Sequence, residues 1–465
     1  MTPIPEHIKA NHARLSPSNL EFLNRVEADP TLFERQTFRS VVEDDELVGF
    51  PLNPWPLFID PETMRSIEEL SVGLTSLALS LPERFFGNDP NKLAEYYGFE
   101  VDLARLFGEL LDDPHHMAGH FCRGDYILTP DGFRCLELNI SASLGGWESS
   151  TWGWRYEQIP AVADILATHG GSHRVRDTFR QMHRHVIRHS QKNLKLDGTM
   201  NVVLAVRPGM ASQTVVDDYL ANAYQEVLGQ ETTFSKGRLI ICNHEKLSIR
   251  NGLVYFEDLQ VHAVVQDWEE SFTQELFACM MAGAINVYNG PLTRLLSDKR
   301  SLALLSEYSH SGLFSKAESQ WIDRGVPWTR DMNPGPVDFE GSSTDLGELL
   351  SANRERFVIK AANSSRGLDV FLGKSCSTSE WEEAVSAAFE ADRPWIAQEC
   401  VESLPMFFQH GESGACPHDV IWGFFTFGRE YGGGFLRVMP SDRTGVVNTA
   451  QGAQESIFFE VGLTD

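Results

Sequence analysis

The segment from Phe121 to Trp154 constrains the fold more than any other part of the sequence, because it predicts a β-hairpin rich in polar residues. Two strand-like runs, Arg123 to Leu128 and Phe133 to Ile140, flank the turn Thr129-Pro-Asp-Gly132. Proline early in the turn and glycine at its end are typical of a three-residue loop, in which a type I turn precedes a left-handed glycine. We therefore expect two antiparallel strands joined by this loop.

The loop length decides which side chains share a face of the hairpin. A three-residue loop places Thr129 opposite Phe133 and hence Asp125 opposite Glu137, whereas a two-residue loop would shift the pairing by one. Because side chains alternate along a strand, one face then carries a guanidinium, two carboxylates and an amide. These polar residues are Arg123, Asp125, Glu137 and Asn139. The apolar residues of the other face are Tyr126, Leu128, Leu136 and Leu138.

Two interpretations of the polar face stay open at this point. Carboxylate and amide oxygens are the hard ligands that Mg²⁺ accepts, usually together with phosphate oxygens and water. A solvent-facing side of an antiparallel hairpin gives the same alternation. The small residues of 141–146 and the nearby Trp147, Trp152 and Trp154 favour a cleft wall over a plain solvated face.

Length and charge limit the class of protein. A chain of 465 residues is long enough for two or three subdomains. Its 65 acidic and 39 basic residues give a net charge of −26, which repels nucleic acid and anionic membranes and favours a cationic co-substrate or a metal. No apolar run has membrane-spanning length, and the first residues have no apolar core for export. Seven cysteines without a CxxC pair argue against a disulfide framework, so we expect a cytoplasmic protein.

The regions around the hairpin predict helices. Residues 1–115 are mainly helical in pattern, with Asp60 as an N-cap for a helix from Pro61 to Leu81. Two more helical stretches cover about 155–167 and 172–191. Histidine clusters occur in both regions, but they lack further metal ligands, so a polar loop and a solvated or interdomain helix face are the preferred interpretations. These histidines are His115, His116, His120, His185 and His189.

A different pattern begins after residue 195. A strand at 201–206, a helix at about 214–228 and a strand at 239–242 predict a βαβ-like unit. Its first loop, RPGMASQT, lacks the glycine spacing of a dinucleotide site. Further strands at 253–256 and 261–265 complete a subdomain that ends near Pro291.

The last third of the chain carries the positive charges of a phosphate site. Lys299 precedes the helical run SLALLSEY, where an anion is stabilised. After a looser stretch at about 324–345, Lys360 ends a strand at 356–360 and is followed by a small-residue loop and a strand at 368–372. Small residues let backbone N–H groups close over phosphates, although a plain hairpin with an exposed lysine gives the same pattern.

The remaining elements are a helix and three strands. The helix spans 379–390, and a buried strand at 394–401 ends in polar Gln398 and Glu399. Strands at 420–427 and 434–438 form a second hairpin, with Arg437 on its returning strand. A polar, glycine-containing stretch at 441–454 is expected to border a site.

Taken together, RGD…LELN, SDKRSLALL, FVIKAANSSRGLDVFLG, WIAQECVE and FTFGREYGGGFLR resemble the ATP-grasp superfamily. The order, with the carboxylates about two hundred residues before the lysine strand, is similar to the circularly permuted branch that includes glutathionylspermidine synthetase-like carboxylate–amine ligases. The likeness covers roughly 120–155 and 290–460. It implies an α+β, circularly permuted ATP-grasp fold with a pre-ATP-grasp βαβ-like subdomain and a helical N-terminal region.

The resemblance implies a role for each matching residue. The Mg²⁺ ligands would be Asp125, Glu137 and Asn139, and the catalytic residues would be Arg123, Ser143 and Arg437. The ATP-binding residues would be Lys299, Lys360, Ser364, Ser365, Arg366, Gly367, Gln398, Glu399 and Val401. The phosphate lid departs from the glycine-dense family pattern, since it reads Asn363-Ser-Ser-Arg366.

The resulting hypothesis has four segments and one reaction. The segments are a helical region at 1–115, a metal-carboxylate half at 116–195, a pre-ATP-grasp subdomain at 196–291 and a nucleotide-clamping half at 292–465. The reaction is ATP-dependent amide formation between a small-molecule carboxylic acid (an amino acid or peptide) and an amine through an acyl phosphate, releasing ADP and phosphate. An inactive nucleotide-binding regulator and a phosphotransferase on a non-carboxylate acceptor are the alternatives, and a homodimer is left open.

Overall fold

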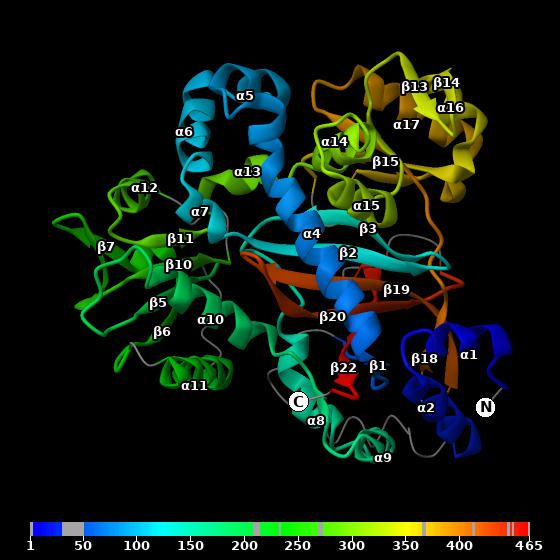
Figure 1. Ribbon diagram of the computed structural model, residues 1–465, viewed down its shortest axis with the longest axis horizontal. Helices are drawn as coiled ribbons and strands as arrows, with labels where there is room; N and C mark the ends of the chain where they lie inside the picture. Colours follow the sequence, from blue (N-terminus) through cyan, green and yellow to red (C-terminus); the bar gives the residue numbers. More distant parts are fainter. Residues whose placement is uncertain are drawn as a thin grey trace.

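The hairpin predicted from the sequence forms one edge of a central antiparallel sheet in the computed structural model (Figure 1). β2 (Phe121–Thr129) pairs with β3 (Gly132–Asn139), and the sheet has the order β21-β20-β19-β2-β3, with β18 also paired to β19. The other strands are β18 (Met406–His410), β19 (Gly414–Phe427), β20 (Glu430–Pro440) and β21 (Gln454–Ser456). The structure describes residues 3–29, 51–207, 214–231, 234–267, 273–364, 369–411, 414–443, 447–448 and 451–463.

The turn of the hairpin differs from the prediction. Thr129 pairs with Gly132, so the loop has two residues, and the predicted pairing of Thr129 with Phe133 is wrong. The register shifts between Asp125 and Tyr126, because a β-bulge inserts one extra residue on β3. This shift restores the pairing of Asp125 with Glu137, which is confirmed.

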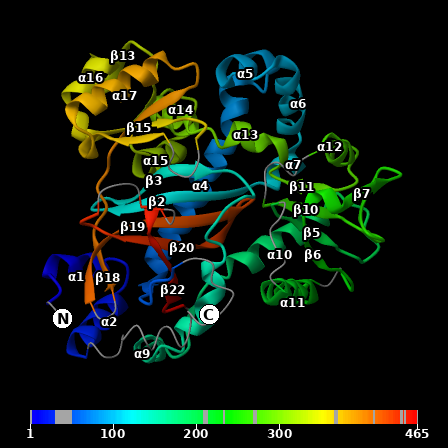
Figure 2. The same cartoon turned by 180° about the vertical axis from the view of Figure 1, so that it is seen from behind.

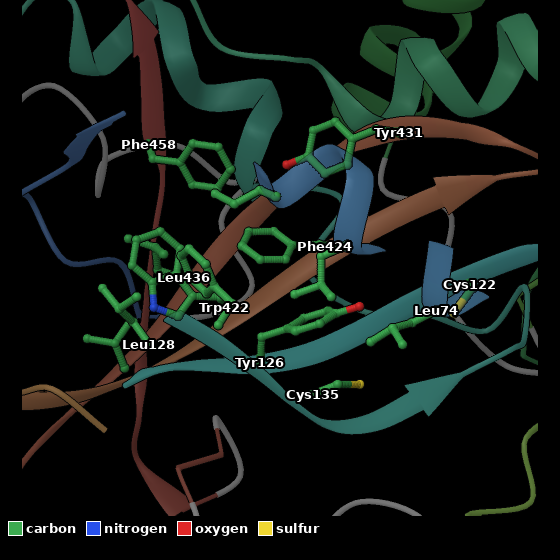
Figure 3. Packing of buried hydrophobic residues seen from close by; sticks show 14 of the residues in the cluster. Leu74, Cys122, Tyr126, Leu128, Cys135, Trp422, Phe424, Tyr431, Leu436 and Phe458 are labelled. Carbon is green, nitrogen blue, oxygen red and sulfur yellow. The ribbon is translucent and has the colours of Figure 1, made fainter. Parts of the chain in front are cut away.

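The extra residue of the bulge is Leu136. Tyr126 pairs with Cys135, and Asp125 pairs with Glu137, so Leu136 has no partner on β2. The prediction that Leu136 lies on the apolar face is therefore wrong, and its side chain is only partly buried. Cys135 takes that place, and Figure 3 shows it near Tyr126 in the apolar cluster.

Each face of the central sheet packs against a different layer. α4 (Pro61–Phe86) crosses the face that carries Tyr126, Trp422 and Phe424 (Figures 1 and 3). Asp60 caps the start of this helix through the Thr63 N–H, as predicted, and the helix extends beyond the predicted end. The other face carries the polar residues and an aromatic group that packs against α10 (Thr178–Ser190).

Further helices lie at the N-terminal side of the sheet and after the hairpin. Short strands add a small sheet of order β1-β22-β4. The N-terminal helices are α1 (Glu6–Ala13), α2 (Pro17–Ala28), α5 (Pro90–Tyr97), α6 (Val101–Leu111) and α7 (Pro114–Ala118). The later helices are α8 (Gly153–Tyr156) and α9 (Pro160–Thr168), with a 3-10 turn at Ser149–Trp152. The strands are β1 (Leu57–Ile59), β4 (His173–Arg174) and β22 (Phe458–Val461).

A parallel sheet lies to one side of the central sheet (green in Figure 1). The predicted βαβ unit is present, because β5 (Val202–Ala205) and β6 (Leu239–Cys242) are parallel neighbours joined by α11 (Thr214–Gln230). The sheet has the order β11-β10-β5-β6 and carries a small antiparallel sheet, β7-β8-β9. The remaining elements are β7 (Leu247–Arg250), β8 (Leu253–Phe256), β9 (Leu259–Gln260), β10 (Ala263–Gln266), α12 (Gln274–Met281) and β11 (Asn286–Tyr288).

The elements between residues 293 and 399 lie near the β3 edge of the central sheet (Figures 1 and 2). Their main sheet has the order β12-β17-β15-β16, and the stretch predicted to be loose contains β12 and a hairpin. The helices are α13 (Thr293–Leu296), α14 (Arg300–Tyr308), α15 (Lys316–Gly325), α16 (Leu346–Ala352) and α17 (Thr378–Glu390). The strands are β12 (Thr329–Asp331), β13 (Pro336–Phe339), β14 (Ser342–Asp345), β15 (Phe357–Ala361), β16 (Val370–Leu372) and β17 (Trp395–Glu399).

The sequence predicts no disulfide framework and no membrane-spanning segment. All seven cysteines fall within the described ranges and are free thiols. Among the helices of the described residues, none combines the length and the apolar character that spanning a bilayer requires.

We predict that Gly423→Ala lowers the free energy of unfolding by ~1–3 kcal/mol, because a methyl group there overpacks the polar face. An added Cβ would lie 2.2 Å from Cε1 of Phe435, whose ring centroid is 5.9 Å from the Arg123 guanidinium and 5.8 Å from that of Arg437. Urea unfolding measures the change. The control is Gly229→Ala at an exposed position of α11 with open space around the new methyl. Equal unfolding midpoints for wild type and Gly423→Ala would contradict this packing.

Candidate functional site

The polar face of the hairpin is organised around a buried carboxylate with two arginine partners. Asp125 Oδ1 accepts from Arg123 Nε at 2.8 Å, and Asp125 Oδ2 accepts from Arg123 Nη2 at 3.1 Å and from Arg437 Nη2 at 2.8 Å. Burial alone would raise the pKa of the Asp125 carboxyl, but the two guanidinium groups outweigh it and hold this pKa below its usual value. Residues 312 positions apart in sequence are thus joined at one charged centre.

Neighbouring backbone groups fix the orientation of this centre. The third donor of Arg123, Nη1, binds the Gly145 carbonyl at 2.9 Å in the loop after β3. Asn139 Nδ2 donates to the Arg123 carbonyl at 3.2 Å and to Asp125 Oδ2 at 3.5 Å. The amide oxygen of Asn139 accepts none of the hydrogen bonds found among the described residues, so it is available to a ligand.

Lys360 connects the β15 sheet to the bulge of the central hairpin. It lies on β15 and is 8% exposed, and its Nζ donates to the Leu136 carbonyl at 3.2 Å and to Gln398 Oε1 at 2.8 Å. Burial lowers the pKa of Lys360, which Glu137 opposes and Lys299 reinforces. The bulge therefore presents the Leu136 carbonyl to a buried lysine 224 residues away in sequence.

Lys299 places a second ammonium group against β3, beside the Leu136 carbonyl that Lys360 contacts. It immediately precedes α14, as predicted, and its backbone N–H donates to the Ala362 carbonyl at 3.1 Å. Its Nζ lies 3.1 Å from Glu137 Oε1 and also donates to the Ser364 carbonyl. Lys299 and Lys360 thus converge on the two adjacent residues Leu136 and Glu137.

The residues predicted for the adenine hinge divide into two groups. Gln398 is fully buried, and its amide bridges Lys360 and Thr329, where its Nε2 donates to Thr329 Oγ1 at 3.2 Å. Glu399 and Val401 instead line an open pocket of about 540 Å³ together with the side chain of Trp328. Gln398 therefore orients Lys360, whereas Glu399 and Val401 are accessible to a ligand.

Some predicted residues lie outside this network. Ser143 is exposed in the loop after β3, where its N–H donates to Ser141 Oγ at 3.0 Å, and it does not join the charged network of the described chain. Ser364 contributes its carbonyl to Lys299. Ser365, Arg366 and Gly367 lie outside the described residues, so their roles stay predictions.

Sequence reasoning missed three carboxylates on the same side of the sheet. Glu455 pairs with Arg437 across β20 and β21, and its Oε2 accepts from Ser149 Oγ. Burial raises the pKa of Glu148 to about 8, and Glu455 and Asp267 add to the shift. Burial also raises the pKa of Asp267, at the carboxyl end of β10, to about 7. The only sequence signal was the position of Glu148 in the small-residue loop beside the tryptophans.

The predicted polar histidine loop is wrong. His115 and His116 lie on α7, and His120, just before β2, is buried. His189 on α10 is also buried, where its Nδ1 lies 3.1 Å from Tyr288 Oη and its Nε2 lies 2.9 Å from the His115 carbonyl. These histidines line a packed junction of α7, α10 and β11, which sequence alone could not distinguish from a polar surface.

The polar face offers oxygen ligands that fit a hard divalent cation in part. Glu137 has one oxygen that is not taken by Lys299, and Asn139 has its amide oxygen. Asp125 Oδ2 already accepts from both arginines and from Asn139, whereas Oδ1 accepts from Arg123 Nε and keeps a second lone pair for a metal. Four cationic side chains surround these oxygens, so the site can also neutralise a polyphosphate: Arg123, Lys299, Lys360 and Arg437.

Comparison with known structures identifies the class of fold. No family model and no curated protein matches the sequence. The structure of a glutathione synthetase-like effector (GSS30) from Globodera pallida, in its apo form, is similar with a TM-score of 0.57 and 12% identity, over 93% of this chain and 98% of that chain. The chain therefore has a glutathione synthetase-like α+β fold.

A second similar structure is a putative gamma-glutamylcysteine synthetase from Methylobacillus flagellatus KT. It gives a TM-score of 0.41 and 11% identity over 82% of this chain and 87% of that chain, which is below the level of a common fold. The fold predicted from the resemblance is confirmed at this coarse level. The circular permutation and the likeness to glutathionylspermidine synthetases stay predictions.

We predict that Glu148→Gln makes stability less dependent on pH. The pKa of Glu148 is raised from 4.5 to about 8 in the folded state, so folding favours its protonated form. Its contribution to stability is complete below about pH 4.5 and is lost as the pH rises towards about 8, because the folded chain then binds more protons than the unfolded chain.

Urea unfolding at pH 5 and pH 8 measures this effect. Wild type should lose more stability between the two pH values than Glu148→Gln, whose side chain stays neutral. Glu382→Gln, at an exposed position of α17, serves as the control and should keep the wild-type pH dependence. The same loss of stability in Glu148→Gln and wild type would contradict the assignment.

Proposed function

We propose that this protein is an ATP-dependent carboxylate–amine ligase, which forms an amide through an acyl phosphate and releases ADP and phosphate. The observation that carries the proposal is the convergence of Lys299 and Lys360 on Glu137 and the Leu136 carbonyl, beside the pairing of Asp125 with two arginines. This arrangement combines phosphate-binding cations with metal-binding oxygens on one sheet face. The glutathione synthetase-like fold supports the proposal.

The cations would bind and orient the phosphate chain of ATP. Lys299, Lys360 and Arg437 come from three separate elements and would neutralise the charge that develops on the transferred phosphoryl group. Their present partners are protein oxygens, so phosphate oxygens would replace those partners when ATP binds. Glu399 and Val401 would contact the adenine from the pocket that they line.

The oxygen ligands would hold Mg²⁺ beside that chain. Glu137 and Asn139 would be its principal ligands, with Asp125 supplying the second lone pair of an oxygen already bound by arginine. Bound Mg²⁺ would supply charge neutralisation and alignment of the phosphate oxygens.

Arg123 and the three neighbouring carboxylates would act on the two substrates. Arg123 would hold the carboxylate of the acid and stabilise the oxyanion formed when the amine attacks; one such donor is typically worth ~3 kcal/mol in the barrier. Glu148, Asp267 and Glu455 lie on the same side of the sheet, and we propose that a cationic amine binds among them and favours the ionised forms of Glu148 and Asp267. Ser143, at the border of this region, would contact substrate.

The segment boundaries form part of the same proposal. The metal-carboxylate half would be 116–195 and the nucleotide-clamping half 292–465, with a helical region at 1–115 and a pre-ATP-grasp subdomain at 196–291. This order would represent a circular permutation, because the carboxylate hairpin precedes the lysine strand.

We predict that Lys360→Met abolishes ligase chemistry. Acids and amines, varied in combination, are screened for ADP release, and each active acid is then tested with hydroxylamine, which traps acyl phosphates as hydroxamates. Wild type should form ADP, phosphate and amide in equal amounts. Lys360→Met should lose about 10²-fold or more of both signals, because phosphate charge is left uncompensated. Lys195→Met, which changes an exposed lysine, is the matched control and should retain activity.

The products distinguish the ligase from its alternatives. AMP and pyrophosphate would indicate an adenylating enzyme, and ADP release that no carboxylate stimulates would indicate a phosphotransferase. Nucleotide binding without any product would indicate a regulator. Each of these three results contradicts the proposed function, whereas hydroxamate formation that depends on both the acid and ATP supports it.

A further inference from the structure

A cluster of two histidines and a cysteine lies on the β18–β19 hairpin and has no part in the proposed ligase chemistry. Across these strands, His410 pairs with Gly414, Phe408 with Cys416, and Met406 with His418. Opposite residues share a face of a sheet, and so do residues two apart on one strand, so His410, Cys416 and His418 lie on the same face. One ligand atom from each lies within 4.8 Å of the other two.

His418 is oriented in the way that metal-binding histidines are. Its ring is fully buried, and its Nδ1 lies 2.8 Å from the Cys416 carbonyl. Donation of the Nδ1 proton to this carbonyl leaves the lone pair on Nε2, which is the usual arrangement behind a metal ligand. Nε2 is buried and has no hydrogen-bond partner among the described residues. Such an unpartnered polar atom requires an explanation.

The other two candidate ligands, Cys416 and His410, are more exposed to solvent than His418. Cys416 is half-buried with its Sγ 3.8 Å from His418 Nδ1, and the ring of His410 is exposed with its centroid 6.1 Å from that of His418. Ligand atoms around tetrahedral Zn²⁺ are separated by ~3.4–3.8 Å, given Zn–N and Zn–S bonds of about 2.1 and 2.3 Å. One ligand atom of each residue lies within 4.8 Å of the other two, so rotation of the His410 and Cys416 side chains towards His418 would close the cluster around a metal.

We propose that His410, Cys416 and His418 form a binding site for Zn²⁺. Imidazole nitrogen and thiolate sulfur are the preferred ligands of this ion, whereas Mg²⁺ and Ca²⁺ prefer oxygen. On binding, the Cys416 S–H bond breaks, a Zn–S bond forms and one proton is released to solvent. The lone pair of a neutral histidine ring binds the metal directly, so the proton that is released comes from the thiol.

The fourth position would be open to water or to Asp442. This carboxylate is exposed just after β20, and the N–H of the preceding Ser441 donates at 3.0 Å to the carbonyl of Pro417, which lies between Cys416 and His418 in sequence. A thiolate and one carboxylate would balance the two charges of Zn²⁺. Three protein ligands from a short hairpin and an accessible fourth position are therefore compatible with this chain.

The zinc site is separate from the proposed ligase site. On β19, Ile421 pairs with Arg437, whereas His418, three residues earlier, pairs with Pro440, and the register between them is regular. Residues three apart on a strand point to opposite faces. The metal would therefore lie on the face opposite Arg437 and Asp125. It would link β18 to β19 and would not contact the nucleotide.

Metal titration of the full-length protein tests the proposal. After treatment with a chelator and dialysis, we expect one equivalent of Zn²⁺ to bind by calorimetry, with release of a proton. Co²⁺ in place of Zn²⁺ should give a cobalt–thiolate charge-transfer band. Cys416→Ser should abolish this band and weaken Zn²⁺ binding at least tenfold, and the exposed His410→Ala should also weaken binding at least tenfold without loss of fold.

Cys376→Ser is the matched control, because Cys376 is another half-buried thiol and lies elsewhere in the chain. It should leave both the band and the Zn²⁺ affinity unchanged. The proposal is overturned if wild type binds no stoichiometric Zn²⁺, if the Co²⁺ spectrum lacks the thiolate band, or if Cys376→Ser weakens binding as much as Cys416→Ser.

Discussion

The contact between Lys360 and the Leu136 carbonyl is the interaction on which the arrangement of the site depends. β3 is the edge strand of the sheet, so alternate carbonyls of this strand point away from β2, and at the bulge the Leu136 carbonyl accepts from Lys360. The same bulge returns Glu137 to the face of Asp125, where Glu137 meets Lys299. One inserted residue therefore places carboxylates from one half of the chain against lysines from the other.

Each charged side chain of the resulting network has an oxygen or nitrogen partner within the protein, which stabilises the network without a ligand. Burying Asp125 costs free energy that its two arginines offset, and a buried carboxylate left without them would be strongly destabilising. Each cation is nevertheless bound to an oxygen that a phosphate oxygen can replace. The internal ion pairs hold the side chains close to the positions that ATP binding requires, which reduces the reorganisation needed in the reaction.

The positions of individual site residues were predicted better than the turn, the bulge and the contacts between distant segments. Alternation and residue chemistry located Asp125 opposite Glu137 and Lys299 at a helix start, because these are local properties. The two-residue loop shifts the strand pairing by one residue, and the bulge at Leu136 shifts it back. Residue propensities alone do not distinguish this combination from the predicted three-residue loop without a bulge. The burial of Glu148 and the packing of the histidines of α7 and α10 were not predicted, because their environment depends on contacts between distant segments.

The most direct test of the account is calorimetric binding of a non-hydrolysable ATP analogue, with and without Mg²⁺, to wild type and Glu137→Gln. The central claim is that Glu137 exchanges Lys299 for Mg²⁺ when nucleotide binds to this face. Wild type should bind the analogue more tightly with Mg²⁺ than without it, and Glu137→Gln should lose that difference while retaining Mg²⁺-independent binding. An equal effect of Mg²⁺ on both proteins, or no binding to wild type, would contradict the account.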